Sequence, residues 1–157
     1  MDKSLRATID PESLTVSRTS FTNADLASAW AALTDPLKII EWFGDRARID
    51  AVEVGAHGML GWDTEGDFPI EIVEVDEPHV FAFRWAFEPE VAVTISNSTL
   101  VRFTLSNDAA GTRIDLAEAG FALVDDHGAS PRARAEANRE GWDEELDELV
   151  AWLDSGL

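Results

Sequence analysis

Glu118 is the acidic residue whose place in the sequence best suits it for chemistry. It follows Ile114 and Leu116 at intervals of two, and alternate residues of a strand point to the same face. Because the two apolar residues mark the buried face, Glu118 is expected to point inward. A carboxylate in an apolar cavity could serve as a general acid, a general base or a ligand anchor. The simpler interpretation, favoured by the sequence alone, is a carboxylate at a strand end that reaches water.

Other residue types exclude several kinds of chemistry. The chain has no cysteine, so disulfides, thiolate metal ligands and a cysteine nucleophile are excluded. It also lacks the Gly-x-Ser-x-Gly motif that presents a serine nucleophile. The histidines lie far apart, and none is followed three or four residues later by an acidic residue or another histidine. We therefore predict no metal site and no cofactor, and we expect exposed side chains at His57, His79 and His127.

A long amphipathic helix is predicted at the C-terminal end. Its opposite face is acidic, and Pro131 suits its first turn. A helix of this kind, laid against a sheet, can cover a core or roof a cavity. The apolar residues recur at offsets of four, three and four, which is the spacing of one helical face: Trp142, Leu146, Leu149 and Leu153.

The region before this helix alternates with a period of two, which is typical of antiparallel strands with one buried face. Two short helices are predicted after the first strand, the first capped by Asn23 and the second running from Pro36 to Gly44. We predict an α+β fold in which a curved seven-stranded antiparallel sheet wraps around the long helix. Residues 1–13 are expected to be a loose lead-in and 14–157 a single domain. The predicted strands are 14–21, 47–54, 58–62, 70–76, 80–85, 99–106 and 112–120.

The composition narrows the range of partners. The net charge of −19 would repel phosphate backbones, so nucleic-acid binding is not expected. The sequence has no apolar run of the roughly 20 residues that a membrane span needs, so membrane insertion is not expected either. The first residues lack the apolar core of a signal peptide, and a cytoplasmic location is expected. The acidity is interpreted first as a solubility or salt adaptation, and second as a face that docks a basic partner.

Several motifs, in this order and spacing, resemble the START-like (SRPBCC) superfamily, and within it the branch named after the activator of heat-shock-protein-ninety ATPase. The first is AWAALTDP at 29–36, followed by EWF at 41–43. The resemblance covers about 14–153 and implies the helix-grip fold of START-like and Bet v-like proteins, with a deep cavity between the sheet and the last helix. The further matching segments are EIVEVDEP at 71–78, FAFRW at 81–85, VRFTL at 101–105, GTRIDL at 111–116, GF at 120–121 and GW at 141–142.

The resemblance also indicates where a ligand would bind, because the second short helix and the long helix border the cavity mouth in this fold. Clefts lined by aromatic residues with one or two polar groups are ordinary small-molecule sites. Several of the aromatic residues must nevertheless simply fill the core, and Trp30 is expected to be one of them. The candidate ligand-binding residues are Trp42, Phe43, Phe81, Phe83, Trp85, Phe103, Glu118, Trp142 and Leu146.

Three functions are compatible with these features. The first is a binding protein that holds a small hydrophobic molecule, a lipid or an aromatic compound, between sheet and helix. The second, suggested by the family name and the acidic helix, is a chaperone-associated interaction module. The third is a cyclase- or hydrolase-type enzyme with Glu118 as base. It ranks last because no second catalytic group accompanies Glu118, so no catalytic residue is assigned.

Overall fold

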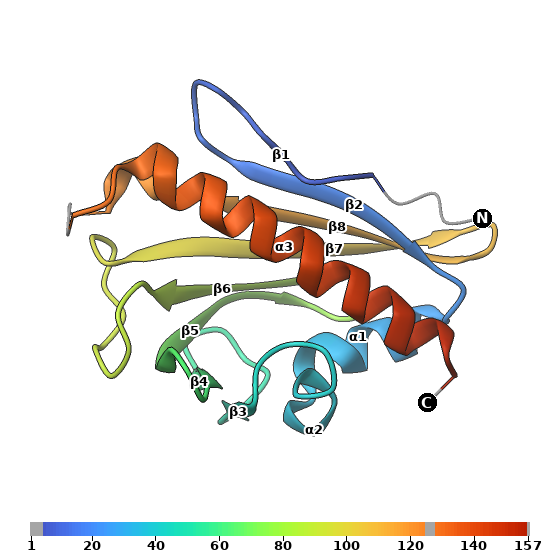
Figure 1. Cartoon of the computed structure of the whole chain (residues 1–157). Coiled ribbons are helices and arrows are strands. Elements are labelled where there is room, and N and C mark those ends of the chain that lie inside the picture. Colours follow the sequence, from blue (N-terminus) through green and yellow to red (C-terminus); the bar gives the residue numbers. More distant parts are fainter. Residues whose placement is uncertain (1–4, 125–127, 157) are drawn as a thin grey trace.

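The computed structural model describes residues 5–124 and 128–156 and shows one curved antiparallel sheet with a long helix across one face (Figure 1). The strand order in the sheet is β1-β2-β8-β7-β6-β5-β4-β3. Two short helices follow β2, and the long helix α3 closes the chain. The strands are β1 (Thr8–Ile9), β2 (Val16–Thr22), β3 (Arg46–Ile49), β4 (His57–Trp62), β5 (Gly66–Asp76), β6 (Val80–Ala86), β7 (Ser98–Asp108) and β8 (Gly111–Ala119), and the helices are α1 (Leu26–Thr34), α2 (Pro36–Ile39), η1 (Phe121–Leu123) and α3 (Pro131–Asp154).

The α+β helix-grip prediction is confirmed, but the sheet has eight strands rather than seven. The additional strand, β1, is only two residues long and pairs with β2 at the sheet edge. It was missed because two residues are too short for a hydrophobic period to be visible. The expected lead-in at 1–13 thus includes, in its described part, a strand that joins the sheet. The strand predicted at 47–54 ends at Ile49, and the chain then turns before β4.

Short polar side chains determine where the helices begin. The Asp25 carboxylate accepts from the backbone N–H of Ser28, so Asp25 caps α1 in place of the predicted Asn23. Asp35 ends α1 and caps α2, whose first residue is Pro36. The Ser130 hydroxyl accepts from Ala133 N–H at the start of α3.

The predicted apolar face of α3 is the buried one. Trp142, Leu146, Leu149 and Leu153 are at most 6% exposed. The helix packs mainly against β2, and also against η1, α1 and β1.

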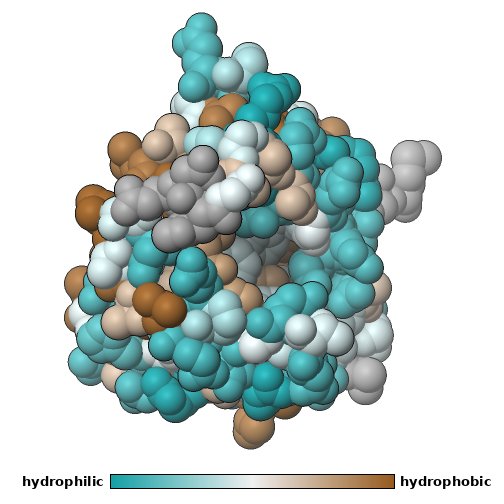
Figure 2. Space-filling model, turned by 60° about the vertical axis from the view of Figure 1, so that its left-hand side comes forward, coloured by the Kyte–Doolittle hydropathy of each residue, from teal (hydrophilic) through white to brown (hydrophobic). Residues whose placement is uncertain are grey.

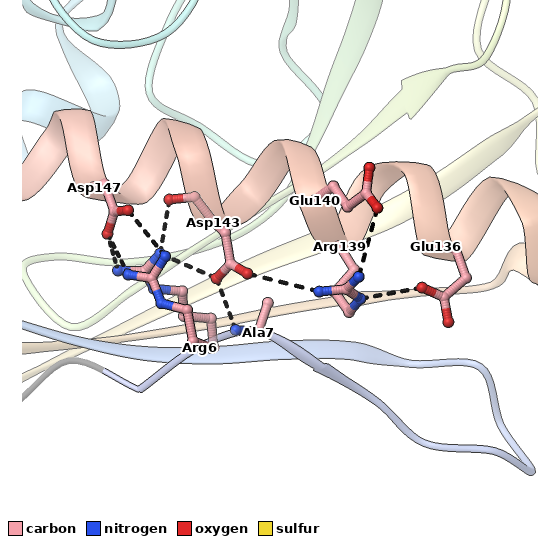
Figure 3. Close-up of polar contacts among 8 residues, drawn as sticks. Arg6, Ala7, Glu136, Arg139, Glu140, Asp143 and Asp147 are labelled. Atoms are coloured by element: carbon pink, nitrogen blue, oxygen red, sulfur yellow. Dashed lines mark hydrogen bonds and ion pairs between the residues drawn. The ribbon is translucent and has the colours of Figure 1, made fainter.

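Arginines hold one side of α3 to the sheet edge (Figure 3). The Arg18 side chain is completely buried and donates to the Asp143 carbonyl at 2.8 Å and to the Asp147 carboxylate at 2.7 Å. Arg6 makes two further bonds to Asp147, at 2.7 and 3.0 Å, and the Ala7 N–H donates to Asp143. We call these contacts the arginine clamp, and they offset part of the charge repulsion along the helix.

Candidate functional site

Glu118, on β8, is fully buried and accepts hydrogen bonds from four side chains. Its Oε1 accepts from the indole N–H of Trp142 at 2.8 Å and from the Asn138 amide nitrogen at 3.0 Å. Its Oε2 accepts from the indole N–H of Trp85 at 2.9 Å, from Thr99 Oγ1 at 2.5 Å and from the same Asn138 nitrogen at 3.1 Å. The donors come from β6, β7 and α3, so one carboxylate joins three separate elements.

This arrangement determines what Glu118 can do. It does not belong to the lining of the cavity described below, and its donors surround both oxygens. The sequence alone favoured a carboxylate at a strand end in contact with water. The buried position of Glu118 contradicts that interpretation. Glu118 instead fixes the planes of Trp85 and Trp142, because each indole has one N–H and that N–H is directed at the carboxylate.

A cavity of about 430 Å³ lies between the first half of α3 and the neighbouring ends of β4, β5 and β6. Figure 2 shows the hollow near the centre of the face that it draws. This volume is within the range of sites that hold small organic molecules. The lining residues are Phe43, Trp62, Glu65, Phe68, Trp85, Ala86, Phe87, Ala137, Asn138, Gly141, Trp142 and Glu145.

Four aromatic rings form a continuous wall of the cavity. Phe43 stacks on Trp142 with a centroid distance of 5.3 Å and an interplanar angle of 22°. Trp62 meets Phe43 edge-on at 5.1 Å, and Trp85 lies 5.9 Å from Trp142. These spacings are those of favourable aromatic pairs. With two of the indoles fixed by Glu118, the wall is held in place before any ligand arrives.

The predicted site residues separate into two groups in space. Phe43, Trp85 and Trp142 line the cavity. Leu146 is completely buried in the core. The other four aromatic candidates border a void of only about 10 Å³, which is about the smallest space that can hold one water. They are packed in the core around that void and do not line the larger cavity: Trp42, Phe81, Phe83 and Phe103.

Sequence reasoning missed the rest of the lining. Trp62 and Phe68 flank the β4–β5 turn, and a hairpin at that turn brings them to one end of the sheet. Asn138 and Glu145 lie four residues before and three residues after Trp142, so helical spacing places all three on one face of α3. That spacing was the available signal, but among so many acidic residues Glu145 did not stand out.

Glu145 has the most unusual electrostatic environment of the lining. Burial, together with the nearby carboxylates of Glu148 and Glu144, raises its pKa to about 7. Its Oε2 is buried and has no hydrogen-bond partner among the described residues. A buried acceptor without a partner is unfavourable, so a donor placed in the cavity beside it would be stabilised.

Within residues 5–124 and 128–156, no group of three or more side chains is arranged to hold a metal ion. His57 is 65% exposed and lies 3.4 Å from Glu71, and His79 Nδ1 is 3.0 Å from the Leu105 carbonyl. His127 lies outside the described residues. None of the described helices is long and apolar enough to cross a membrane.

The curved sheet, the long helix across it and the cavity between them define a helix-grip protein of the START-like class. A sequence model described as "Activator of Hsp90 ATPase homolog 1-like protein" matches residues 23–154. The chain therefore belongs to this family. A comparison with curated proteins found no match.

Solved structures share the fold. Protein MLL2253 from Mesorhizobium loti is 22% identical with a TM-score of 0.73, and the match covers 90% of this chain and 97% of that one. DynU16, from the dynemicin biosynthetic locus, is 23% identical with a TM-score of 0.70, covering 90% of this chain but only 48% of that one. CalU16 from Micromonospora echinospora is 18% identical with a TM-score of 0.68, covering 98% and 86%. At these identities the likeness shows the fold alone.

Proposed function

We propose that this protein binds a small molecule with a large apolar or aromatic part in the cavity beneath the first half of α3. The observation that carries the proposal is the cavity of about 430 Å³, with its preformed aromatic wall. Removing apolar ligand surface from water contributes about 25 cal/mol per Å². A wall that is already fixed limits the ordering that binding would otherwise require.

Two features favour binding over catalysis. Glu118, the carboxylate considered as a base, is enclosed by donors and does not line the cavity. A general base must come within hydrogen-bond reach of the proton that it abstracts. An enzymatic role for Glu118 would therefore require the donors around it to be displaced first.

The chaperone-associated role is less well supported than ligand binding. It depends on an accessible acidic face of α3, and of the acidic residues there Asp143 and Asp147 are engaged by the arginine clamp, whereas Glu144 and Glu148 are exposed. We therefore keep the cavity as the basis of the proposed function.

A cavity-filling variant tests the proposal. Gly141 lies inside α3 and lines the cavity, and a Cβ built on it meets no described atom within 4 Å apart from its chain neighbours and the adjacent helix backbone. Gly141→Leu should fill the space without disturbing the helix. The matched control is Ala151→Leu, which adds a side chain of the same size to an exposed position of the same helix.

The measurement is thermal unfolding of each protein with a set of lipids and aromatic compounds. A compound that binds the folded state raises the midpoint in proportion to its affinity and concentration. We expect at least one compound to raise the unfolding midpoint of the natural protein and of Ala151→Leu. The same compound should leave the midpoint of Gly141→Leu unchanged. No stabilising compound at all would contradict the proposal, as would equal stabilisation of Gly141→Leu.

A further inference from the structure

Resting on the proposed function, we propose that the ligand is a cation: an apolar or aromatic molecule with a protonated amine, bound by Glu145 against the aromatic wall. The reason lies in the polar groups that the cavity offers. Its polar side chains are Glu65, Asn138 and Glu145, and no lysine, arginine or histidine is among the described lining residues.

Glu118 strengthens this preference for a cationic ligand, because its carboxylate accepts hydrogen bonds from side chains that line the cavity. The indole N–H groups of Trp85 and Trp142 both point to its carboxylate, as does the amide nitrogen of Asn138. What Asn138 can still offer a ligand is its carbonyl oxygen and its second N–H, and what the two indoles can offer is their rings. Together with the carboxylates of Glu65 and Glu145, the wall presents mainly acceptors and π faces. A ligand that matches it supplies donors and positive charge.

The Glu145 carboxylate, which lines the cavity, is the position for the ammonium group. Its Oε2 lacks a hydrogen-bond partner among the described residues, and a charge-assisted bond is the strongest that the carboxylate could gain. The net charge of −19 attracts cations and disfavours anions such as fatty-acid carboxylates.

The protonation of Glu145 provides an independent test of amine binding. Burial raises the pKa of Glu145 to about 7, so the carboxyl is partly protonated near neutral pH. The charged groups that act on it are Glu148 and Glu144 on its own helix, and Glu65 on the β4–β5 turn lines the same cavity. An ammonium group favours the ionised carboxylate, so amine binding should release a proton and should strengthen as the pH rises through 7.

Three probes of one shape test the inference: phenylbutylamine, phenylbutanol and phenylbutyrate, titrated by calorimetry into the natural protein. We expect the amine to bind about tenfold more tightly than the alcohol, and the carboxylate most weakly. Glu145→Gln should remove the preference for the amine, so that the amine and the alcohol bind with similar affinity. The control Glu140→Gln removes the same charge from an exposed residue of the same helix that does not line the cavity, and it should keep the preference.

The possible failures are distinguishable. If the alcohol or the carboxylate binds as well as the amine, the cation inference is wrong and the proposed binding function stands. Amine binding that is unchanged in Glu145→Gln, or that releases no proton near neutral pH, also overturns the inference. If none of the three probes binds, the proposed function fails together with it.

Discussion

Glu118→Gln is expected to destabilise the fold although it preserves the shape of the side chain. The glutamine amide replaces one oxygen by an NH₂ group, which cannot accept. If the NH₂ takes the place of Oε1, the Trp142 N–H is left without its acceptor. If it takes the place of Oε2, Trp85 loses its bond to Glu118 and keeps only Thr99 Oγ1 at 3.0 Å. Hydrogen bonds to charged groups contribute about 1.5–3 kcal/mol, and a stranded buried donor costs about 1–3 kcal/mol.

The expected loss is therefore about 2–4 kcal/mol in the free energy of unfolding. It would be measured by urea denaturation followed by tryptophan fluorescence. Domains of this kind have a total stability of about 5–15 kcal/mol, so the variant should remain folded at low urea. Glu140→Gln, an exposed change of the same type, should stay within about 0.5 kcal/mol of the natural protein. A Glu118→Gln variant as stable as this control would refute the idea that the carboxylate ties β6, β7 and α3 together.

Three further predictions concern α3. Arg18→Met keeps the buried bulk but removes the bonds to Asp143 and Asp147, and it should lower the unfolding free energy by about 1–3 kcal/mol in urea denaturation; an unchanged urea midpoint would show that the Arg18 part of the arginine clamp contributes nothing. Gly141→Ala should raise stability by about 0.5–1 kcal/mol, because alanine favours a helix interior and the added Cβ has space; a lower melting temperature would contradict this. Because the pKa of Glu145 is raised from 4.5 to about 7, the folded state holds its proton more tightly than the unfolded state, so this group's contribution to stability falls as the pH rises across that range. Glu145→Gln should make the decline less steep in urea titrations at several pH values, and an identical slope in the variant would exclude this explanation.

Local patterns predicted the fold because the decisive signals lie within single elements. The alternation in 80–85 identifies a strand, and the spacing of Trp142 and Leu146 identifies the buried face of α3. The motifs resembling START-like proteins gave the order in which these elements are assembled. What the sequence did not predict was β1, the short helix η1 and the exact ends of elements, since two-residue strands, single turns and capping choices such as Asp25 over Asn23 depend on neighbouring chain segments.

The site was less predictable because it depends on distances between elements. Phe83 and Trp85 share one face of β6 and are two residues apart, yet only Trp85 reaches the cavity. The inward direction of Glu118 followed from strand parity, but its partners are up to 33 residues away in the sequence. No periodicity shows that Trp85 and Trp142 will both donate to it. These side chains meet at one carboxylate because the curved sheet packs against the helix.

The arginine clamp also has a consequence for how quickly a ligand could come and go. It holds α3 to β2 and to the segment just before β1, on the side of the helix away from the cavity lining at β4, β5 and β6. Lifting the helix would break several charge-assisted bonds at once, so that route has a high barrier. The easier route is through the opposite rim, formed by the β4–β5 turn at Glu65 and the end of β6 at Phe87. Residence time should therefore depend on the length and stiffness of that turn, while affinity depends on the wall beneath it.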